Sequence, residues 1–358
     1  MKVLVLGAGH VGQAVIHDMA EDHEVSAGDI YTENLESVEK FAETFQLNVK
    51  NKEETVAKME EHDVVVGVLP GDLGFEAVKS AVEAGTDMVD VSFMPEDPFS
   101  LHEEAKKKDV SVVVDAGFGP GISNVFMGRI EEEMDHLEDV MIRIGGLPLD
   151  PEPPLYYKLT WSPYDLIEEY VREARIIRDG EVVEVDPFEE INEVELAGKE
   201  FEEFYSDGLR TLLKTIDAET MEETTLRWKG HLERMKVLRE LGFFEKKNLD
   251  RTLEVIKPLM EFDSKDFCIM DVKAKGKENG DKAEMNYFFY DEADENFSSM
   301  ARSTGFAASA FTKLLIQEKE KIDSGIIPPE RLGRRKEHHD FMVKELRDRG
   351  INIEIDKG

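Results

Sequence analysis

The first thirty residues combine a short apolar run with closely spaced glycines. Residues 2–6 (KVLVL) are apolar and mostly branched, as a buried parallel strand requires, and they lead directly into GAGHVG at residues 7–12. A helical pattern then continues to Ala20. A strand, a GxGxxG turn and a helix in this order are typical of a dinucleotide-binding βαβ unit.

Each glycine of this turn has its own steric task. Gly7 allows the tight turn, Gly9 lets the backbone approach a pyrophosphate, and Gly12 lets the helix lie close to the strand. His10 and Val11 stand between them, where the helix N-terminus faces the negative charge of the ligand. We therefore expect all five residues to border a bound dinucleotide.

A carboxylate stands where the adenosine ribose of such a ligand would lie. The second apolar run, residues 24–28, ends in Asp29, about 20 residues after the glycines, which is the spacing of a ribose-binding acid. Its carboxylate would accept hydrogen bonds from the ribose hydroxyls and repel a 2′-phosphate. The sequence therefore predicts NAD, with NADP the less favoured cofactor.

Strands continue to alternate with helices up to residue 116. We expect strands at 63–69, 88–92 and 111–116, and helices at 35–45, 52–61, 75–84 and 98–107. This alternation predicts an α/β fold with a doubly wound parallel Rossmann sheet. Ligands of such sheets collect beyond the carboxyl ends of the strands. The residues expected there are Leu69, Pro70, Ser92 and Gly117 for the cofactor, with Asp90 and Asp115 as candidate catalytic acids.

The pattern changes at residues 117–121 (GFGPG). After a helix at 122–134, shorter strands are expected at 140–145, 156–160, 174–177, 226–229, 267–273 and 284–290. Asn279-Gly280, between the last two, is a strong hairpin signal. We expect residues 123–296 to form an inserted α+β domain, with a mainly antiparallel sheet, for substrate binding and dimerisation.

The C-terminal part is expected to return to the first domain. A small-residue helix at 300–317 and an amphipathic helix at 338–349 precede a strand-like stretch at 351–355. The dinucleotide domain would then be discontinuous, made of residues 1–122 and 297–358.

Charge and composition exclude several classes of partner. With 79 acidic against 44 basic residues, the formal charge of −35 argues against nucleic acid and anionic membranes as partners. The acids are spread along the chain, so they indicate either a strongly solvated surface or adaptation to a salty cytoplasm. Cys268 is the only cysteine, and neither a signal peptide nor an apolar run of about 18 residues is apparent, which predicts a cytoplasmic protein.

Several longer segments, in the same order along most of the chain, resemble the saccharopine dehydrogenase family, and its lysine 6-dehydrogenase-like members in particular. They are GAGHVG (7–12), VVDAGFGPGISN (113–124), GGLPLDPEPPLYYKLTWSP (145–163), DGLRTLL (207–213), LRWKGHLERMKVLRELG (226–242) and ARSTGFAASA (301–310). The resemblance implies an NAD(P)-dependent oxidoreductase that acts on a carbon–nitrogen bond of an amino acid. It also implies a homodimer built through the second domain.

Two segments point to different substrates within that family. The run YKLTWSP at residues 157–163 resembles the saccharopine reductases, whereas RWKGH at residues 227–231 resembles the lysine dehydrogenases. The primary expectation is oxidation of the side-chain amine of lysine or a related amino acid. The alternative is the chemistry of a saccharopine-type secondary amine.

Oxidation of an amine by hydride loss requires a neutral nitrogen, so a base must first remove the proton. His231 follows a strand that stops at a glycine and precedes a helix, and we expect it to be that base because histidine titrates near neutral pH. Asp90, Asp115 and Lys229 are the next candidates.

The carboxylate of an amino-acid substrate needs a cation in so acidic a protein. Arg210, Arg227 and Lys229 are the candidates, and the last two alternate with Trp228, so they would share one face of a strand. Trp161 would form a wall for the aliphatic part of the substrate.

The sequence gives little support to metal sites or to other classes of enzyme. The adjacent His338 and His339 look exposed and lack a third ligand, so no metal site is expected. Walker, HExxH and nucleophile-elbow motifs are absent from the sequence. A non-catalytic NAD-binding sensor that uses the same fold is the alternative from another functional class.

Overall fold

The computed structural model describes all residues, 1–358. They divide into two units, which are described separately below. The first unit contains residues 1–129 and 301–350, and the second contains residues 130–300 and 351–358. The sequence placed the boundaries at 122/123 and 296/297 and gave the whole C-terminus to the first domain.

A parallel sheet of seven strands forms the centre of the first unit, in the order β15-β6-β5-β4-β1-β2-β3. The reversal of strand order on either side of β1 is that of a doubly wound sheet, which confirms the predicted fold class. The strands are β1 (Lys2–Leu6), β2 (Glu24–Asp29), β3 (Glu43–Gln46), β4 (Val64–Gly67), β5 (Asp87–Asp90), β6 (Ser111–Val113) and β15 (Gly325–Ile327).

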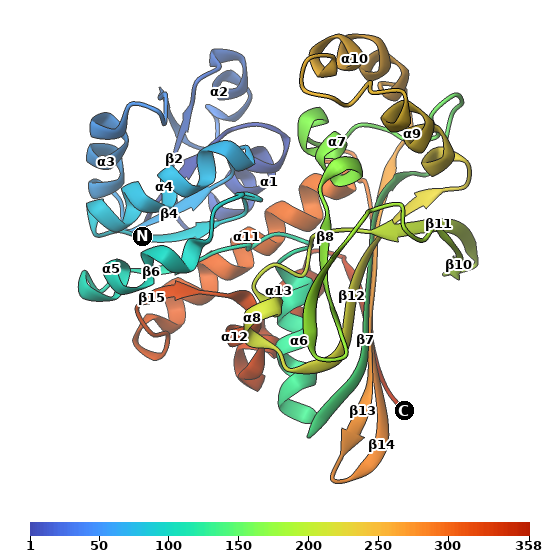
Figure 1. Cartoon of the computed structure of the whole chain (residues 1–358). Helices are drawn as coiled ribbons and strands as arrows, with labels where there is room; N and C mark the ends of the chain where they lie inside the picture. Colours follow the sequence, from blue (N-terminus) through green and yellow to red (C-terminus); the bar gives the residue numbers. More distant parts are fainter. The chain divides into compact units, whose positions relative to one another are not determined.

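Helices α1 to α5 lie beside the strands of this sheet, and further helices come from the C-terminal part of the unit (Figure 1). They are α1 (His10–Met19), α2 (Thr32–Val38), α3 (Lys52–Glu60), α4 (Gly71–Ala84), η1 (Pro98–Leu101), α5 (His102–Lys107), α6 (Ile122–Glu133), α11 (Ser299–Glu318), η3 (Lys319–Lys321), α12 (Pro329–Arg334) and α13 (Lys336–Asp348). Strands, α3, α4 and α5 bury one apolar cluster that includes Leu4, Val65 and Val78.

The helix expected at residues 35–45 is wrong in its second half. Helix α2 ends at Val38, and residues 43–46 form the edge strand β3, which is parallel to β2. Phe45 pairs with Gly28, where a Cβ atom would lie 3.1 Å from the Phe45 ring. An aromatic residue that covers a glycine on a neighbouring strand favours the sheet over continued helix.

A mixed sheet of nine strands forms the second unit. The main path is β10-β11-β12-β7-β13-β14-β16; off this path, β8 pairs with β12 and β9 pairs with β8. Only β12 and β7 are parallel, so the sheet is mainly antiparallel, as predicted. The strands are β7 (His136–Pro148), β8 (Ala174–Arg178), β9 (Glu181–Val185), β10 (Asn192–Leu196), β11 (Lys199–Tyr205), β12 (Ala218–Trp228), β13 (Asp266–Glu278), β14 (Asp281–Glu292) and β16 (Asn352–Lys357).

The predicted hairpin at Asn279-Gly280 is confirmed. Glu278 pairs with Asp281, and the two residues between them have φ of +53° and +85°, as a two-residue turn of this kind requires. The strand predicted at 156–160 is absent, because Tyr156 has a left-handed φ of +55° and interrupts any extended run.

Short helices and aromatic residues pack on the second sheet. The helices are α7 (Pro163–Val171), α8 (Leu212–Thr215), α9 (His231–Glu240), α10 (Leu249–Ile256) and η2 (Lys257–Met260). Their core is unusually aromatic and includes Tyr157, Tyr170, Phe201, Phe204 and Phe267, each at most 1% exposed. Rings of this size supply much of the apolar area that stabilises the unit.

The C-terminal strand belongs to the second unit, contrary to the prediction. Helix α13 lies in the first unit, but β16 pairs antiparallel with β14, with Ile353 opposite Phe289. Both of these side chains are buried. Burial of one apolar face of β16 on the second sheet explains why the strand leaves the domain that contains α13.

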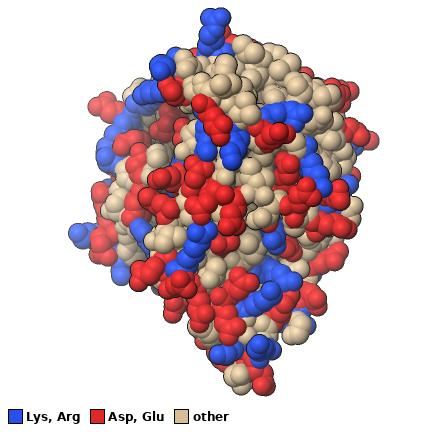
Figure 2. Space-filling view, turned by 45° about the vertical axis from the view of Figure 1, so that its right-hand side comes forward, with Lys and Arg blue, Asp and Glu red and all other residues tan.

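The surface carries the acidic excess without gathering it in one place. Figure 2 shows red side chains distributed over the visible face, with blue ones between them. His338 and His339, expected to be exposed, are 3% and 4% exposed on α13. No helix has the length and apolar character that a membrane crossing requires.

Candidate active site

The glycine turn packs tightly at two positions and leaves space at the third. Gly7 has φ of +96°, and a Cβ atom there would lie 2.3 Å from the carbonyl oxygen of Val68. A Cβ at Gly12 would lie 2.0 Å from the carbonyl oxygen of Gly7. At Gly9, by contrast, no atom lies within 4 Å of the Cβ position. The turn therefore fixes the strand–helix geometry and keeps open the side on which a pyrophosphate would lie.

Helix α1 begins at this turn. Gly9 is its N-cap and provides no side-chain hydrogen bond to the first amides. His10 is exposed and Val11 half-buried. The amide groups and the positive end of the helix dipole therefore suit the phosphates of a dinucleotide.

Asp29 is fixed beside the same turn at the end of β2. Its Oδ2 accepts hydrogen bonds from the Ala8 amide at 2.7 Å and from Asn34 Nδ2 at 3.1 Å. Its Oδ1 accepts from the Tyr31 amide at 2.8 Å. Residues 30–34 (IYTEN) contain no lysine or arginine, and Glu33 adds a negative charge. This composition suits ribose hydroxyls better than a 2′-phosphate.

The other predicted cofactor contacts lie at the carboxyl ends of neighbouring strands. Leu69 and Pro70 connect β4 to α4; Leu69 is half-buried and Pro70 is exposed, whereas Ser92 is 2% exposed after β5. Gly117 donates its amide to the carbonyl of Pro120 at 3.2 Å. All four residues therefore lie along one edge of the first sheet, as the alternation of strands and helices predicted.

Asp90 serves the turn after β5. Its Oδ1 accepts a hydrogen bond from the Ser92 amide at 3.0 Å and another from the Ser92 hydroxyl. A Cβ at Gly67 would lie 2.3 Å from Asp90 Oδ2, so the carboxylate fills the space that this glycine leaves. With no exposed surface, Asp90 has the contacts of a structural residue.

Asp115 lies at the end of the adjacent strand β6. It is 1% exposed and has a left-handed φ of +51°, a conformation that costs energy in a residue other than glycine. The next residue, Ala116, donates its amide to the carbonyl of Asp90 at 2.9 Å. Strained backbone at the carboxyl edge of a doubly wound sheet is characteristic of functional positions.

In the second unit, Arg227 occupies a box of aromatic rings. It is 2% exposed near the end of β12, and its guanidinium carbon lies 4.7 Å, 5.8 Å and 5.5 Å from the ring centroids of Tyr157, Tyr170 and Phe204. Its Nη2 pairs with Glu169 on α7. Its Nε donates to the Tyr170 hydroxyl at 3.1 Å. The charge of Arg227 is thus neutralised within the protein.

His231 is connected to the same box and has no exposed surface. Its Nδ1 lies 2.6 Å from the carbonyl oxygen of Leu155, and its Nε2 lies 2.8 Å from the Tyr170 hydroxyl. Because a carbonyl only accepts, Nδ1 carries the proton and Nε2 accepts one from Tyr170. Burial, assisted by the charge of Arg227, lowers the pKa of His231 to about 3. A neutral ring with both nitrogens occupied cannot take a proton from a substrate, which corrects its predicted role as the base.

The remaining substrate candidates lie in different surroundings. Lys229 follows the end of β12 and pairs with Glu193 at 2.9 Å and Glu200 at 3.2 Å, with its side chain 38% exposed. It therefore does not share the buried environment of Arg227. Arg210 is half-buried in the loop between β11 and α8, with a left-handed φ of +49°.

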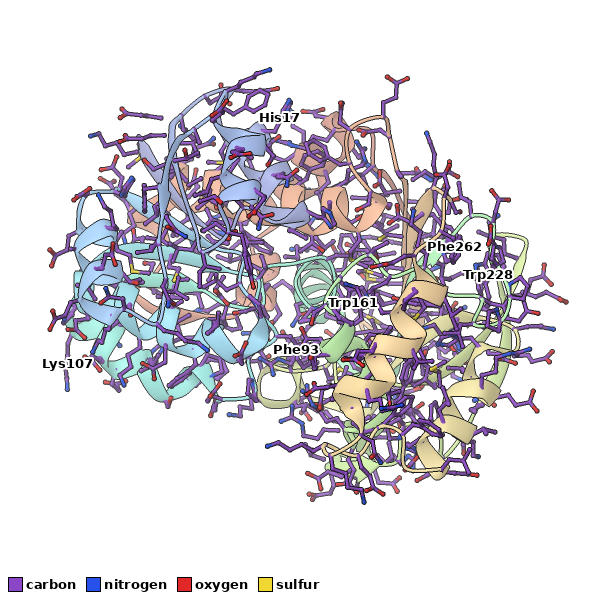
Figure 3. All side chains as sticks on the ribbon, turned by 90° about the horizontal axis from the view of Figure 1, so that it is seen from above. His17, Phe93, Lys107, Trp161, Trp228 and Phe262 are labelled. Atoms are coloured by element: carbon purple, nitrogen blue, oxygen red, sulfur yellow. The ribbon has the colours of Figure 1, made fainter.

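Trp161 is half-buried and donates from Nε1 to the Tyr157 hydroxyl at 2.8 Å. Figure 3 shows that it lies well apart from Trp228, the other tryptophan of the chain. Its hydrogen bond fixes one edge of the indole ring, and the partly buried ring packs against the apolar core of the second unit.

Sequence reasoning missed several residues of this network. They are the buried Tyr157 and Tyr170 and the half-buried Glu169; outside the network, sequence reasoning also missed the buried Glu223 of β12. Glu169 and Tyr170 belong to the stretch EEYV, which looks like a solvated helical surface. The only available signal was Arg227 in a strand otherwise suited to burial, because a buried arginine requires an acidic partner.

Comparison with known proteins agrees with this arrangement. A family model described as "Saccharopine dehydrogenase NADP binding domain" matches residues 3–113, and one described as "Saccharopine dehydrogenase C-terminal domain" matches residues 117–351. The structure of apo saccharopine dehydrogenase (L-Glu forming) from Saccharomyces cerevisiae superposes with a TM-score of 0.83 at 22% identity, covering 100% of this chain and 99% of that one. At this identity the superposition establishes the fold.

The sequence matches to curated proteins cover less of each chain than the structural superposition does. Saccharopine dehydrogenase [NADP(+), L-glutamate-forming] of S. cerevisiae is 26% identical over 268 residues, which are 68% of this chain and 58% of the relative. Mitochondrial alpha-aminoadipic semialdehyde synthase of Rattus norvegicus is 24% identical over 266 residues, 28% of its length. These relatives are not lysine 6-dehydrogenases, so the subfamily expected from the sequence is not supported.

Proposed function

Because the chain belongs to the saccharopine dehydrogenase family, we propose that it is an NAD-dependent dehydrogenase that oxidises a carbon–nitrogen bond of an amino acid. The observation that carries this proposal is the glycine turn with open space at Gly9 beside the fixed carboxylate of Asp29. The bond is that to the side-chain nitrogen of lysine or of a related amino acid.

The cofactor supplies the hydride acceptor, and the protein must supply positioning and a base. With His231 neutral and occupied, Lys229 ion-paired at the surface and Asp90 packed into its turn, we assign the base to Asp115. Its place at the carboxyl edge of β6 and its strained backbone support this role. Asp115 would remove the proton from the substrate ammonium. The lone pair of the neutral nitrogen would then drive the loss of hydride from the adjacent carbon.

The choice between substrates depends on how many carboxylates the protein can bind. Arg227 is paired with Glu169, and Lys229 is paired with Glu193 and Glu200. Neither cation therefore offers its full positive charge to a substrate carboxylate. Paired cations favour a substrate with few carboxylates, such as lysine. Arg210 is the proposed contact of the substrate carboxylate and Trp161 that of the aliphatic chain, as the sequence pattern suggested.

A saccharopine-type secondary amine is the second candidate. The name of the S. cerevisiae relative and the YKLTWSP run at residues 157–163 favour it. Its additional carboxylates would require further cations at the site. We also infer a homodimer through the second unit, as the family resemblance implies, which sedimentation of the purified protein would measure.

The direct test is the near-ultraviolet absorbance of reduced nicotinamide after NAD is mixed with lysine, saccharopine or other amino acids. We expect reduction with at least one of them, and a decrease of about 10²- to 10⁴-fold in turnover for Asp115→Asn at unchanged NAD affinity. An NAD-binding sensor would bind the cofactor and reduce none of it, and that result would contradict the proposal.

A further inference from the structure

A buried carboxyl group lies beneath the loop that carries Arg210. Glu223, in the middle of β12, is 4% exposed. Its Oε1 accepts a hydrogen bond from the Ser206 hydroxyl at 3.1 Å, and its backbone carbonyl accepts from the Ser206 amide at 3.0 Å. Its Oε2 is buried without a hydrogen-bond partner. Buried oxygens of this kind are rare and call for a physical explanation.

The loop of residues 206–211 is shaped around this carboxyl group. A Cβ atom at Gly208 would lie 1.6 Å from Glu223 Oε1 and 2.5 Å from Oε2, so only glycine lets the loop cross the carboxyl group at this distance. On the other side, Asp207 accepts two hydrogen bonds from Arg175 of β8, at 2.8 Å and 2.9 Å. Leu209 is fully buried, and Arg210 follows with its left-handed backbone.

The surroundings favour the protonated form of this acid. Burial is the main cause, and the nearby carboxylates of Asp207 and Glu169 add to it, whereas the hydrogen bond from Ser206 opposes it. Together they raise the pKa of Glu223 to about 8. Two cations are near these acids, but Arg175 is paired with Asp207 and Arg227 with Glu169. At neutral pH the loop therefore lies on an uncharged carboxyl group.

We propose that Glu223 is a positioning residue that holds the 206–211 loop and thereby sets the direction of Arg210 toward the carboxylate of the substrate. Ionisation would place a negative charge in a buried space beneath Gly208 and next to Asp207. The loop would then have to move to admit water, and Arg210 would move with it. This inference rests on the proposed function, because it assigns Arg210 to the substrate.

The experiment compares the pH dependence of KM for the amino-acid substrate in the wild type and in Glu223→Gln, an uncharged variant of the same shape. Substrate ionisation is common to both proteins, so it cancels in their ratio. From about pH 7 to about pH 9.5, the ratio of wild-type to variant KM should rise about tenfold, the loss expected for a misplaced charged hydrogen bond, with kcat and NAD affinity unchanged.

Two further variants test the position of the loop and provide a control on the same strand. Gly208→Ala should raise KM across the whole pH range, because the added methyl group displaces the loop from Glu223. Glu219→Gln, at an exposed position of the same strand, should follow the wild type. Parallel KM profiles for wild type and Glu223→Gln, a kinetically silent Gly208→Ala, or a Glu223→Gln chain that does not fold at neutral pH would each overturn the inference.

A stability measurement separates this inference from the proposed function. An acid with a raised pKa holds its proton in the folded chain after the unfolded chain has lost it, so its contribution to stability falls as pH rises between about 4.5 and about 8. Urea unfolding should show the wild type losing stability relative to Glu223→Gln across that window. If no amino acid is oxidised, the proposed function fails while this result still stands; equal slopes would overturn the inference even in an active enzyme.

Discussion

The hydroxyl group of Tyr170 donates a hydrogen bond to Nε2 of His231 at 2.8 Å. The same hydroxyl accepts one from Arg227, and the ring of His231 donates to the carbonyl of Leu155. A continuous chain of hydrogen bonds therefore joins Glu169 on α7 to Leu155 in the segment that precedes Trp161. In this arrangement His231 anchors the segment that contains Leu155, and we expect a positioning role for it in place of proton transfer.

The pH dependence of stability tests this role of His231. Its lowered pKa means that the folded chain resists protonation, whereas the unfolded chain takes up the proton near pH 6.5. Stability is therefore fully present above that pH and is lost as pH falls toward about 3. In urea unfolding, the wild type should lose up to about 1.4 kcal/mol per pH unit more than His231→Gln in this window. Equal slopes would show that the ring is accessible to protons in the folded protein.

The pair of Arg227 and Glu169 should be costly to break from one side. Arg227→Met leaves a carboxylate near the core and should lower the free energy of unfolding by roughly 3–5 kcal/mol. The double variant Arg227→Met, Glu169→Leu should recover a large part of that loss, because neither charge then remains. Chemical denaturation measures the free energy of unfolding of both single variants and of the double variant. If the loss in the double variant equals the sum of the losses in the single variants, the two residues are not coupled as assigned.

The parts of the fold that were predictable depend on local patterns. The turn at Gly7 to Gly12 and the acid at Asp29 are short-range signals, and the hairpin at Asn279-Gly280 is another. By contrast, residues 43–46 form an edge strand because Phe45 covers Gly28, a contact with a residue that is distant in sequence. The C-terminal strand likewise depends on burial of Ile353 opposite Phe289.

The site was harder to predict than the fold for the same physical reason. Alternation placed Arg227 and Lys229 on one face, but β12 ends at Trp228, so only Arg227 is buried. His231 has the residue type of a base, yet its protonation depends on burial and on Tyr170, neither of which the local sequence reveals. Glu223 similarly appears as one acid among many.

The glycine turn offers a matched pair of variants. Gly9→Ala adds a methyl group to open space in an extended backbone conformation, so the melting temperature should hardly change, while NAD affinity should fall by about tenfold or more because the pyrophosphate can no longer approach. Gly12→Ala meets the Gly7 carbonyl and should destabilise the fold itself. Unchanged NAD binding in Gly9→Ala, measured by titration, would place the cofactor elsewhere.

Asp29 should influence both the affinity for NAD and the choice between NAD and NADP. Asp29→Ala should weaken NAD binding, because the ribose hydroxyls lose their acceptor. The ratio of NAD affinity to NADP affinity should also fall, because the 2′-phosphate is no longer repelled. Titrations with both cofactors measure this. Equal or tighter NAD binding in the variant would remove Asp29 from that role.

Ionic strength should stabilise the protein. The formal charge of −35 produces self-repulsion that salt screens, so the melting temperature should rise from low salt to about 1 M KCl. A flat or falling curve would mean that the distributed acids seen in Figure 2 serve solvation alone.

Isotope transfer tests the central claim most directly. Lysine and saccharopine, each deuterated at the lysine-chain carbon that bears the side-chain nitrogen, are incubated with the protein and NAD, and the mass of the reduced cofactor is measured. We expect reduced cofactor one mass unit heavier with at least one substrate, because the hydride comes from that carbon. Reduced cofactor without deuterium would place the oxidation at another carbon, and the absence of reduced cofactor with both would contradict the assignment of this chain as an amino-acid dehydrogenase.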